Sequence, residues 1–259
     1  MKLPAVFLSH GAPTLAVGEG LEARAWAKLA AELPRPQSIL VVSAHWDTRD
    51  PEVSAAPHLE TIYDFRGFPR ELYEQKYPAP GAPDLAQKTA ALVQRAGLPC
   101  SIDPARGLDH GAWVPLKWMY PKADIPCTQL SVQSPRGPQH HVRLGEAIAP
   151  LAGEGVLVLA TGGIVHNLGD LEWDKRGTGE AAQWAAQFND WIADRVERKS
   201  LDDLLAYRER APHASRSHPT EDHFAPFFVA LGAAGWPARR IDIGFDLGTL
   251  GLDGYVFGV

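Results

Sequence analysis

Three strongly apolar runs along the chain each lead into a histidine, and this repeated pattern limits the folds that the chain can adopt. The runs AVFLS, SILVVSA and VLVLATGGIV precede His10, His45 and His166 respectively. A near-continuous apolar run is typical of a strand that is buried on both faces of a mostly parallel sheet. Because ligand crevices form at the carboxyl ends of such strands, we expect the three imidazoles to lie at one edge of the sheet.

The rest of the chain alternates strand-like with helix-like patterns, which is typical of an α/β protein. Strands are predicted at 4–9, 38–44, 127–132 and 155–161, and helices at 21–33, 83–97, 139–151 and 179–198. The stretch 47–82 is predicted to be a long loop, which in a compact domain is usually functional. Residues 239–259 are predicted to form two strands joined by a glycine-rich turn. We therefore expect one α/β domain over residues 1–259 that ends in an antiparallel hairpin.

Composition excludes several classes of protein. The net charge of −6 argues against a nucleic-acid-binding protein, which normally has a basic face. The two cysteines, Cys100 and Cys127, form no CxxC pair, so a bound metal would be held by nitrogen and oxygen ligands. No apolar run has the length of a signal-peptide core or a membrane span. We expect a cytoplasmic protein, and the sequence does not indicate its oligomeric state.

Histidines far apart in the sequence are candidates for a metal site. His10 and His45 follow small residues, which allow another group to approach closely, and their strands are expected to be neighbours. The alternative for each is a strand-end histidine that is hydrogen-bonded to backbone. Thr220, followed by acidic residues, predicts a helix N-cap that places His223 in the first helical turn. From there its imidazole would point into the crevice or, in the alternative, into solvent.

His110 and His166 are better candidates for proton transfer. Each is flanked by glycine and apolar residues, so burial is expected to bring its pKa into the working range. The other histidines are interpreted as structural or solvated: His58, His140, His141, His213 and His218. Because the chain contains no GxGxxG, Walker, GxSxG or HExxH motif, the histidine set is the main indication of function.

Five blocks of this sequence, in order, resemble the class III extradiol ring-cleavage dioxygenases, and specifically their DOPA extradiol dioxygenase-like branch. The blocks span residues 5–235 and read FLSHGAP, VVSAHW, GLDHGAWVPL, GGIVHNL and APHASRSHPTEDHFAPFFVALGAAG. The resemblance implies one α/β domain with a central mixed sheet flanked by helices. It implies that His10, His45 and His223 are metal ligands. It also implies that His166 acts as acid/base and is a candidate fourth ligand, and that His110 positions substrate or oxygen.

The same resemblance implies one divalent metal ion per chain, with Fe(II) expected for activity. Many extradiol enzymes use two histidines and one carboxylate on iron, whereas here the third position is His223. A site of three histidines also suits Zn(II), so both metals stay open. Glu221 is the alternative carboxylate ligand.

The expected activity is insertion of O2 into a catechol-type aromatic, DOPA-like or another catechol, with ring opening to a muconic semialdehyde. Trp46 and Trp113 are candidates for the wall of the ring-binding pocket, and core packing is the alternative for both. Two other functions stay open from the sequence. One is a zinc-dependent hydrolase on a three-histidine site, and the other is a non-catalytic interaction protein of the same fold.

Overall fold

The computed structural model describes residues 2–18 and 20–259, and within them an eight-stranded mixed sheet forms the centre of the molecule. The strand order is β4-β3-β5-β2-β6-β1-β10-β7. These strands are β1 (Ala5–Ser9), β2 (Ser38–Asp47), β3 (Glu52–Ser54), β4 (Ser101–Asp103), β5 (Cys127–Val132), β6 (Val156–Gly162), β7 (Ala238–Ile241) and β10 (Gly254–Phe257). A short antiparallel hairpin, formed by β8 (Phe245–Asp246) and β9 (Leu250–Gly251), lies between β7 and β10 in the sequence.

The four central strands, β5, β2, β6 and β1, are parallel, while β10 and β7 extend the sheet in antiparallel fashion. Side chains of β2 alternate between two hydrophobic clusters. Leu40 and Val42 belong to one cluster, and Ile39 and Val41 to the other. Both faces of the strand are therefore covered, which explains the unbroken apolar run from Ile39 to Val42.

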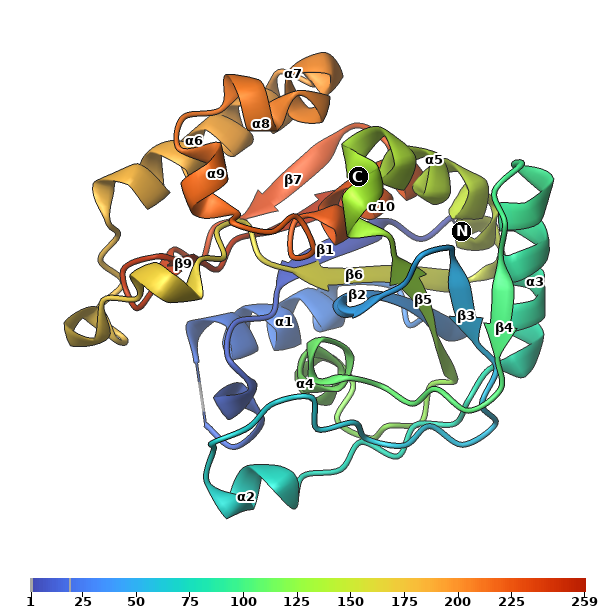
Figure 1. Ribbon diagram of the computed structural model, residues 1–259. Coiled ribbons are helices and arrows are strands. Elements are labelled where there is room, and N and C mark those ends of the chain that lie inside the picture. The colour runs from blue at the N-terminus through green and yellow to red at the C-terminus, as the bar shows by residue number, and fades with distance from the viewer. Residues whose placement is uncertain (1, 19) are drawn as a thin grey trace.

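Helices cover both faces of the sheet (Figure 1). Helix α1 (Leu21–Glu32) packs against α4 (His110–Met119) on one face, and α10 (Ala225–Ala234) packs against α5 (Gly137–Ile148) on the other. The remaining α-helices are α2 (Arg70–Tyr73), α3 (Pro83–Arg95), α6 (Gln183–Glu197), α7 (Leu201–Leu205), α8 (Tyr207–Arg210) and α9 (Ala214–Ser217). Within the described ranges, no helix combines the length and apolar character needed to cross a membrane.

The fold confirms the predicted α/β class, the central mixed sheet flanked by helices and the C-terminal hairpin. Every predicted strand and helix is present, with ends that move by up to a few residues. Gly97 follows α3 with a φ of 78°, as expected of a glycine that ends a helix. Along α6, the buried side chains are those of the predicted apolar stripe, such as Phe188 and Ile192.

Three details of the sequence analysis are wrong. Strands β1 and β2 are not neighbours, because β6 lies between them and pairs with both. Thr220 does not cap a helix, because α10 begins only at Ala225, where Pro226 occupies the first turn. The buried helix α4 was not predicted. Its internal Pro115 lacks the N–H that continues a helix, and a proline inside a pattern normally ends the helix there.

Two buried histidines support this fold away from the clustered imidazoles described below. His141 donates from Nδ1 to the Gly137 carbonyl at 2.8 Å and accepts the Gln133 backbone N–H on Nε2 at 3.2 Å. His218 donates from Nε2 to the Ile164 carbonyl at 2.8 Å. Burial is the main cause that lowers the pKa of His141 to about 4 and that of His218 to about 3. Both rings are therefore neutral structural parts of the folded protein at pH 7.

Acidification should destabilise the protein through these two rings. In the unfolded chain both imidazoles bind a proton below about pH 6.5, whereas in the folded protein they stay neutral down to about pH 4 and 3. The unfolded state therefore binds more protons in this window, and stability falls as the pH falls. The expected slope is about 1.4 kcal/mol per pH unit for each ring.

Urea unfolding between pH 7 and pH 4.5 measures the summed slope, to which the other buried histidines with lowered pKa values contribute in the same direction. His58 is exposed, so a His58→Gln variant should follow the same pH profile as the unmodified protein. A free energy of unfolding that does not change between pH 7 and pH 5 would contradict the assignment of neutral buried rings.

Candidate metal centre and active site

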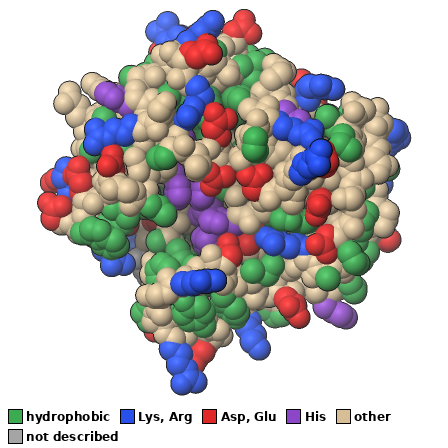
Figure 2. Space-filling view, viewed as in Figure 1, with side chains coloured by type: hydrophobic (Ala, Val, Ile, Leu, Met, Phe, Trp, Pro, Cys, Tyr) green, Lys and Arg blue, Asp and Glu red, His purple; other side chains and the backbone are tan. Residues whose placement is uncertain are grey.

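Five histidines lie together at the edge of the sheet where the parallel strands end. His10 directly follows β1, His45 lies near the end of β2, and His166 follows β6 after a short turn. His110 is the first residue of α4, and His223 lies two residues before α10. Figure 2 shows histidine side chains gathered in a recess near the centre of this face, with acidic side chains beside them. The structure thus brings together all five candidates from the sequence.

The tightest group consists of His10, His45 and His110. One ring nitrogen of each lies within 4.8 Å of the others. The Nε2 atoms of His10 and His45 are 3.0 Å apart, and the ring centroids of His45 and His110 are 4.0 Å apart. His110 was expected to position substrate or oxygen, and its place in this group makes it an additional candidate ligand.

His223 and His166 form the second half of the cluster. The His223 ring centroid lies 5.3 Å from that of His10 and 4.9 Å from that of His45. Its Nδ1–H donates to Asp222 at 2.5 Å, and among the described residues its buried Nε2 has no hydrogen-bond partner. His166 stacks on His223 with 3.4 Å between ring centroids and 4° between planes. His166 is therefore close enough to act on anything that His223 holds.

Burial keeps the rings of His10, His45, His166 and His223 uncharged at neutral pH. It is the largest cause that lowers the pKa of His10 and of His223 well below the usual value, and the neighbouring imidazoles lower both further. Burial likewise lowers the pKa of His45 and of His166 to about 4. At His166 the Asp222 carboxylate opposes this effect. Neutral imidazoles offer lone pairs, which is the form that binds a metal ion.

A divalent metal ion fits this donor set. A buried ring nitrogen without a partner, such as Nε2 of His223, is uncommon in folded proteins and calls for an explanation. Two nitrogens that bind one ion at ~2.1 Å lie about 3 Å apart when they subtend a right angle, and the Nε2 atoms of His10 and His45 are separated by 3.0 Å. Neutral nitrogen ligands suit both iron and zinc, so the donors fit a metal without selecting one.

A buried carboxylate beneath the cluster fixes the positions of His45 and His110. Asp109 has no exposed surface, and it accepts the N–H of Ala112 at 3.2 Å, which caps α4 and makes His110 its first residue. The same carboxylate accepts the hydroxyl of Ser43 at 2.6 Å, and Ser43 in turn accepts the backbone N–H of His45 at 3.2 Å. One charged group therefore connects β2 to α4 directly below the two imidazoles.

Close approach of backbone and rings requires glycine at two points of the site. A Cβ on Gly111 would lie 2.4 Å from the Ser43 hydroxyl and 2.9 Å from the His45 ring. A Cβ on Gly162 would lie 2.0 Å from the carbonyl oxygen of His223. Close approach is thus required at two glycines other than the small residues singled out beside His10 and His45, and the groups that approach are other parts of the site itself.

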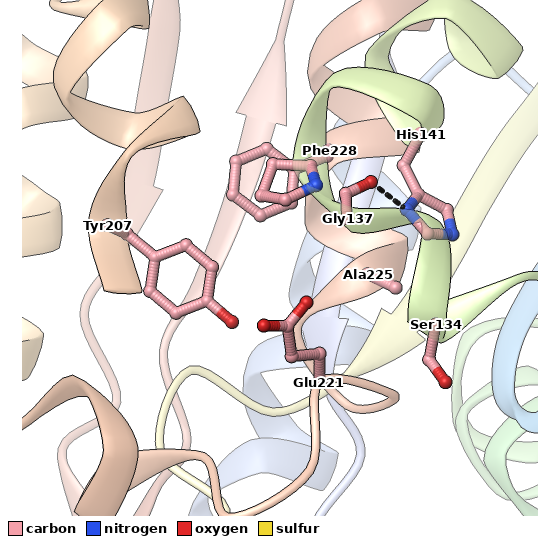
Figure 3. A pocket seen from close by; sticks show the side chains of 8 residues that line it. Ser134, Gly137, His141, Tyr207, Glu221, Ala225 and Phe228 are labelled. Atoms are coloured by element: carbon pink, nitrogen blue, oxygen red, sulfur yellow. Dashed lines mark hydrogen bonds between the residues drawn. The ribbon is translucent and has the colours of Figure 1, made fainter. Parts of the chain in front are cut away.

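Glu221, the alternative carboxylate ligand, faces a different part of the molecule. Its carboxylate lies 3.2 Å from Nε of Arg208. Figure 3 shows it in a small pocket with Tyr207 and His141, and none of the five clustered histidines lines that pocket. This position argues against Glu221 as a metal ligand.

The two tryptophans are almost fully buried. Trp113 has no exposed surface and donates its indole N–H to the Ile62 carbonyl at 3.0 Å. Trp46 is 6% exposed, and the Arg106 guanidinium carbon lies 5.0 Å from the centre of its ring. Packing therefore accounts for both side chains in this structure, and their predicted role in substrate binding stays a prediction. Phe65 borders the cluster, since the centre of its ring lies 5.6 Å from that of His110.

Sequence reasoning missed two carboxylates at this site. Asp109 carries a local signal, since an aspartate directly before a helix is a favoured N-cap, but Pro115 hid the helix. Asp64 carries no such signal. It lies in the predicted loop, 46 residues before His110, and its Oδ1 accepts Nδ1–H of that histidine at 2.9 Å. Only the folded chain shows that this carboxylate belongs to the site.

Comparison with known proteins identifies the family of the chain. The family model described as the catalytic LigB subunit of aromatic ring-opening dioxygenase matches residues 4–257. The chain is 41% identical to a 4,5-DOPA dioxygenase extradiol of Beta vulgaris, over 97% of this chain and 95% of the relative. It is 40% identical to a 4,5-DOPA dioxygenase extradiol of Escherichia coli K12, over 97% and 93% of the two chains.

A solved structure has the same fold. The crystal structure of an uncharacterized protein from Escherichia coli K12 superposes with a TM-score of 0.81 at 35% identity, covering 99% of this chain and 100% of that one. Because the family model and the relatives cover almost the whole chain, the match includes every strand and helix that carries a clustered histidine. The chain belongs to the family of the catalytic LigB subunit of aromatic ring-opening dioxygenases.

Proposed function

We propose that this protein is a metal-dependent extradiol dioxygenase that inserts both atoms of O2 into a catechol and opens the ring to a muconic semialdehyde. The observation that carries the proposal is the cluster of neutral imidazoles at the end of the parallel strands. The substrate is a DOPA-like or another small catechol, and the named relatives support this class. Residues 1–259 act as one catalytic domain, in keeping with the pairing of β1 with β10.

In this proposal His10, His45 and His223 hold the metal ion. The unpartnered Nε2 of His223 supports its inclusion, and His110 is the alternative third ligand because its nitrogen lies within the tight group. Fe(II), when bound, supplies the redox chemistry that lets a catecholate reduce dioxygen. The same ligands would also hold Zn(II). The cytoplasmic location expected from the sequence stays a prediction.

His166 moves the proton that ring opening requires. Burial lowers its pKa to about 4, which is below the working range expected from the sequence and leaves the ring neutral but weakly basic at pH 7. It would therefore take a proton from a catechol hydroxyl that a bound metal ion acidifies. The nearby Asp222 carboxylate favours the imidazolium that results, and this charged ring then donates its proton back as the ring opens. His110, which donates from Nδ1 to Asp64, accepts a hydrogen bond from a substrate hydroxyl through Nε2.

Oxygen uptake with catechols tests the class of reaction. Protein loaded with Fe(II) without air and then mixed with air and DOPA, caffeate or protocatechuate should consume equimolar O2 and catechol and form a coloured ring-opened product. Zinc-loaded protein should give neither, because Zn(II) has no redox chemistry. Tight zinc binding without turnover of any catechol by the iron form would contradict the proposal and favour a zinc hydrolase.

Replacement of His166 tests its role. A His166→Ala variant should lose about 10²–10⁴-fold in kcat, since it lacks the group that transfers the proton, and should keep its full metal content. Metal analysis of the purified variant together with steady-state kinetics measures both. The exposed His58 offers a matched control, and His58→Ala should retain activity and metal. Loss of metal from His166→Ala would instead identify His166 as a fourth ligand.

A further inference from the structure

One carboxylate contacts two histidines of the cluster at once. Asp64 Oδ1 accepts the Nδ1–H of His110 at 2.9 Å and also the backbone N–H of His110 at 3.0 Å. Its other oxygen, Oδ2, lies 3.3 Å from Nδ1 of His45. Within the described part of the chain, the carboxylate is paired with neither lysine nor arginine. One oxygen is thus hydrogen-bonded to His110, and the other makes an electrostatic contact with the Nδ1 atom of His45.

These contacts select one tautomer of each ring. An ionised carboxylate only accepts hydrogen bonds, so a ring nitrogen that faces it carries the proton. Asp64 accepts both N–H groups of His110, so its side chain acts as an acceptor toward the rings. With Nδ1 of His45 and of His110 protonated, Nε2 of each ring presents its lone pair. The Nε2 of His45 is the atom that lies 3.0 Å from Nε2 of His10.

The backbone around Asp64 is held in place from both sides. The Ile62 N–H donates to the Leu108 carbonyl at 2.8 Å, and the Leu108 N–H donates to the Glu60 carbonyl at 2.8 Å. Trp113 anchors the same segment through its indole N–H and the Ile62 carbonyl, at 3.0 Å. The side chain of Asp64 is 22% exposed and that of His45 is 21% exposed, so the contact lies at the open side of the cluster. The segment 55–82 therefore holds the carboxylate of Asp64 in a fixed position at the recess.

We propose that Asp64 is a positioning residue that fixes the tautomers of His45 and His110 and thereby orients their Nε2 atoms for metal and substrate. This inference rests on the proposed metal-dependent function. Partners of this kind, hydrogen-bonded to the far nitrogen of a metal-binding histidine, set ring orientation and ligand basicity. Asp222 stands in the same relation to His223, through Nδ1 at 2.5 Å. Asp64 differs from Asp222 because its one side chain contacts two histidine rings.

An Asp64→Asn variant tests the tautomer directly. The amide has one acceptor oxygen, which stays with the two N–H groups of His110, so its NH2 group faces Nδ1 of His45. His45 must then accept at Nδ1 and carry its proton on Nε2, where the proton blocks metal binding. Long-range ¹H–¹⁵N correlation spectra of ¹⁵N-histidine-labelled protein should show this change of His45 without any metal present.

Metal affinity is the second readout. Calorimetric titration with Zn(II) should show a Kd about 10–100-fold weaker for Asp64→Asn than for the unmodified protein, and Asp64→Glu should recover part of the loss because it keeps two acceptor oxygens. Asp203→Asn is the matched control. Its carboxylate is 27% exposed and contacts Arg195 and Arg210, so the variant loses the same charge without touching a histidine. Circular dichroism should show that all variants are folded.

The outcomes separate this inference from the proposed function. Unchanged zinc affinity together with an unchanged His45 tautomer in folded Asp64→Asn would overturn the positioning role, whatever the protein does with catechols. An equal loss in Asp203→Asn would overturn it too, by showing a general effect of charge. If no catechol is consumed but Asp64→Asn shows the shifted tautomer and the weaker zinc Kd, the proposed reaction fails and the positioning role of Asp64 is supported.

Discussion

Five imidazoles share one small volume at the edge of the sheet, and the rest of the site depends on four of those rings, His10, His45, His166 and His223, being uncharged. Burial and mutual repulsion oppose protonation of His10 and His223, so the cluster holds lone pairs rather than charges at neutral pH. A shared proton satisfies only two nitrogens, as between His10 and His45, whereas one metal ion satisfies three or more. The arrangement therefore favours a metal ion over a proton at its centre.

The parallel sheet explains why residues so far apart in the sequence meet. Strands β1, β6 and β2 lie side by side and run in one direction, so their carboxyl ends lie at the same edge of the sheet. His10 follows β1, His166 follows β6 and His45 lies near the end of β2, which brings the three residues to that edge. Of the other two histidines, His110 begins α4, and His223 lies two residues before α10, on the opposite face of the sheet. These parts pack so closely that neither Gly111 nor Gly162 leaves room for a Cβ atom.

Local pattern predicted most of the fold, and tertiary contact decided the rest. Apolar runs identified the central strands because strands buried on both faces need no alternation, as β2 demonstrates. Strand order is a different kind of information. The sequence places β2 after β1, but β6, more than a hundred residues later, lies between them. Pro115 hid α4 because burial of the helix outweighs the hydrogen bond that proline removes, and no local signal reports burial.

In the site, too, some contacts follow from neighbours in the sequence and others form only in the folded chain. Asp222 is adjacent in sequence to the ring it holds, so the orientation of His223 is set within one turn of chain. Asp64 reaches His45 and His110 only after the segment 55–82 has docked against Leu108 and α4. Because Asp64 contacts two rings, docking of this segment is linked to the choice of tautomer at both His45 and His110. Any contact that stabilises the docked segment therefore also stabilises the form of His45 that presents a lone pair to a metal ion.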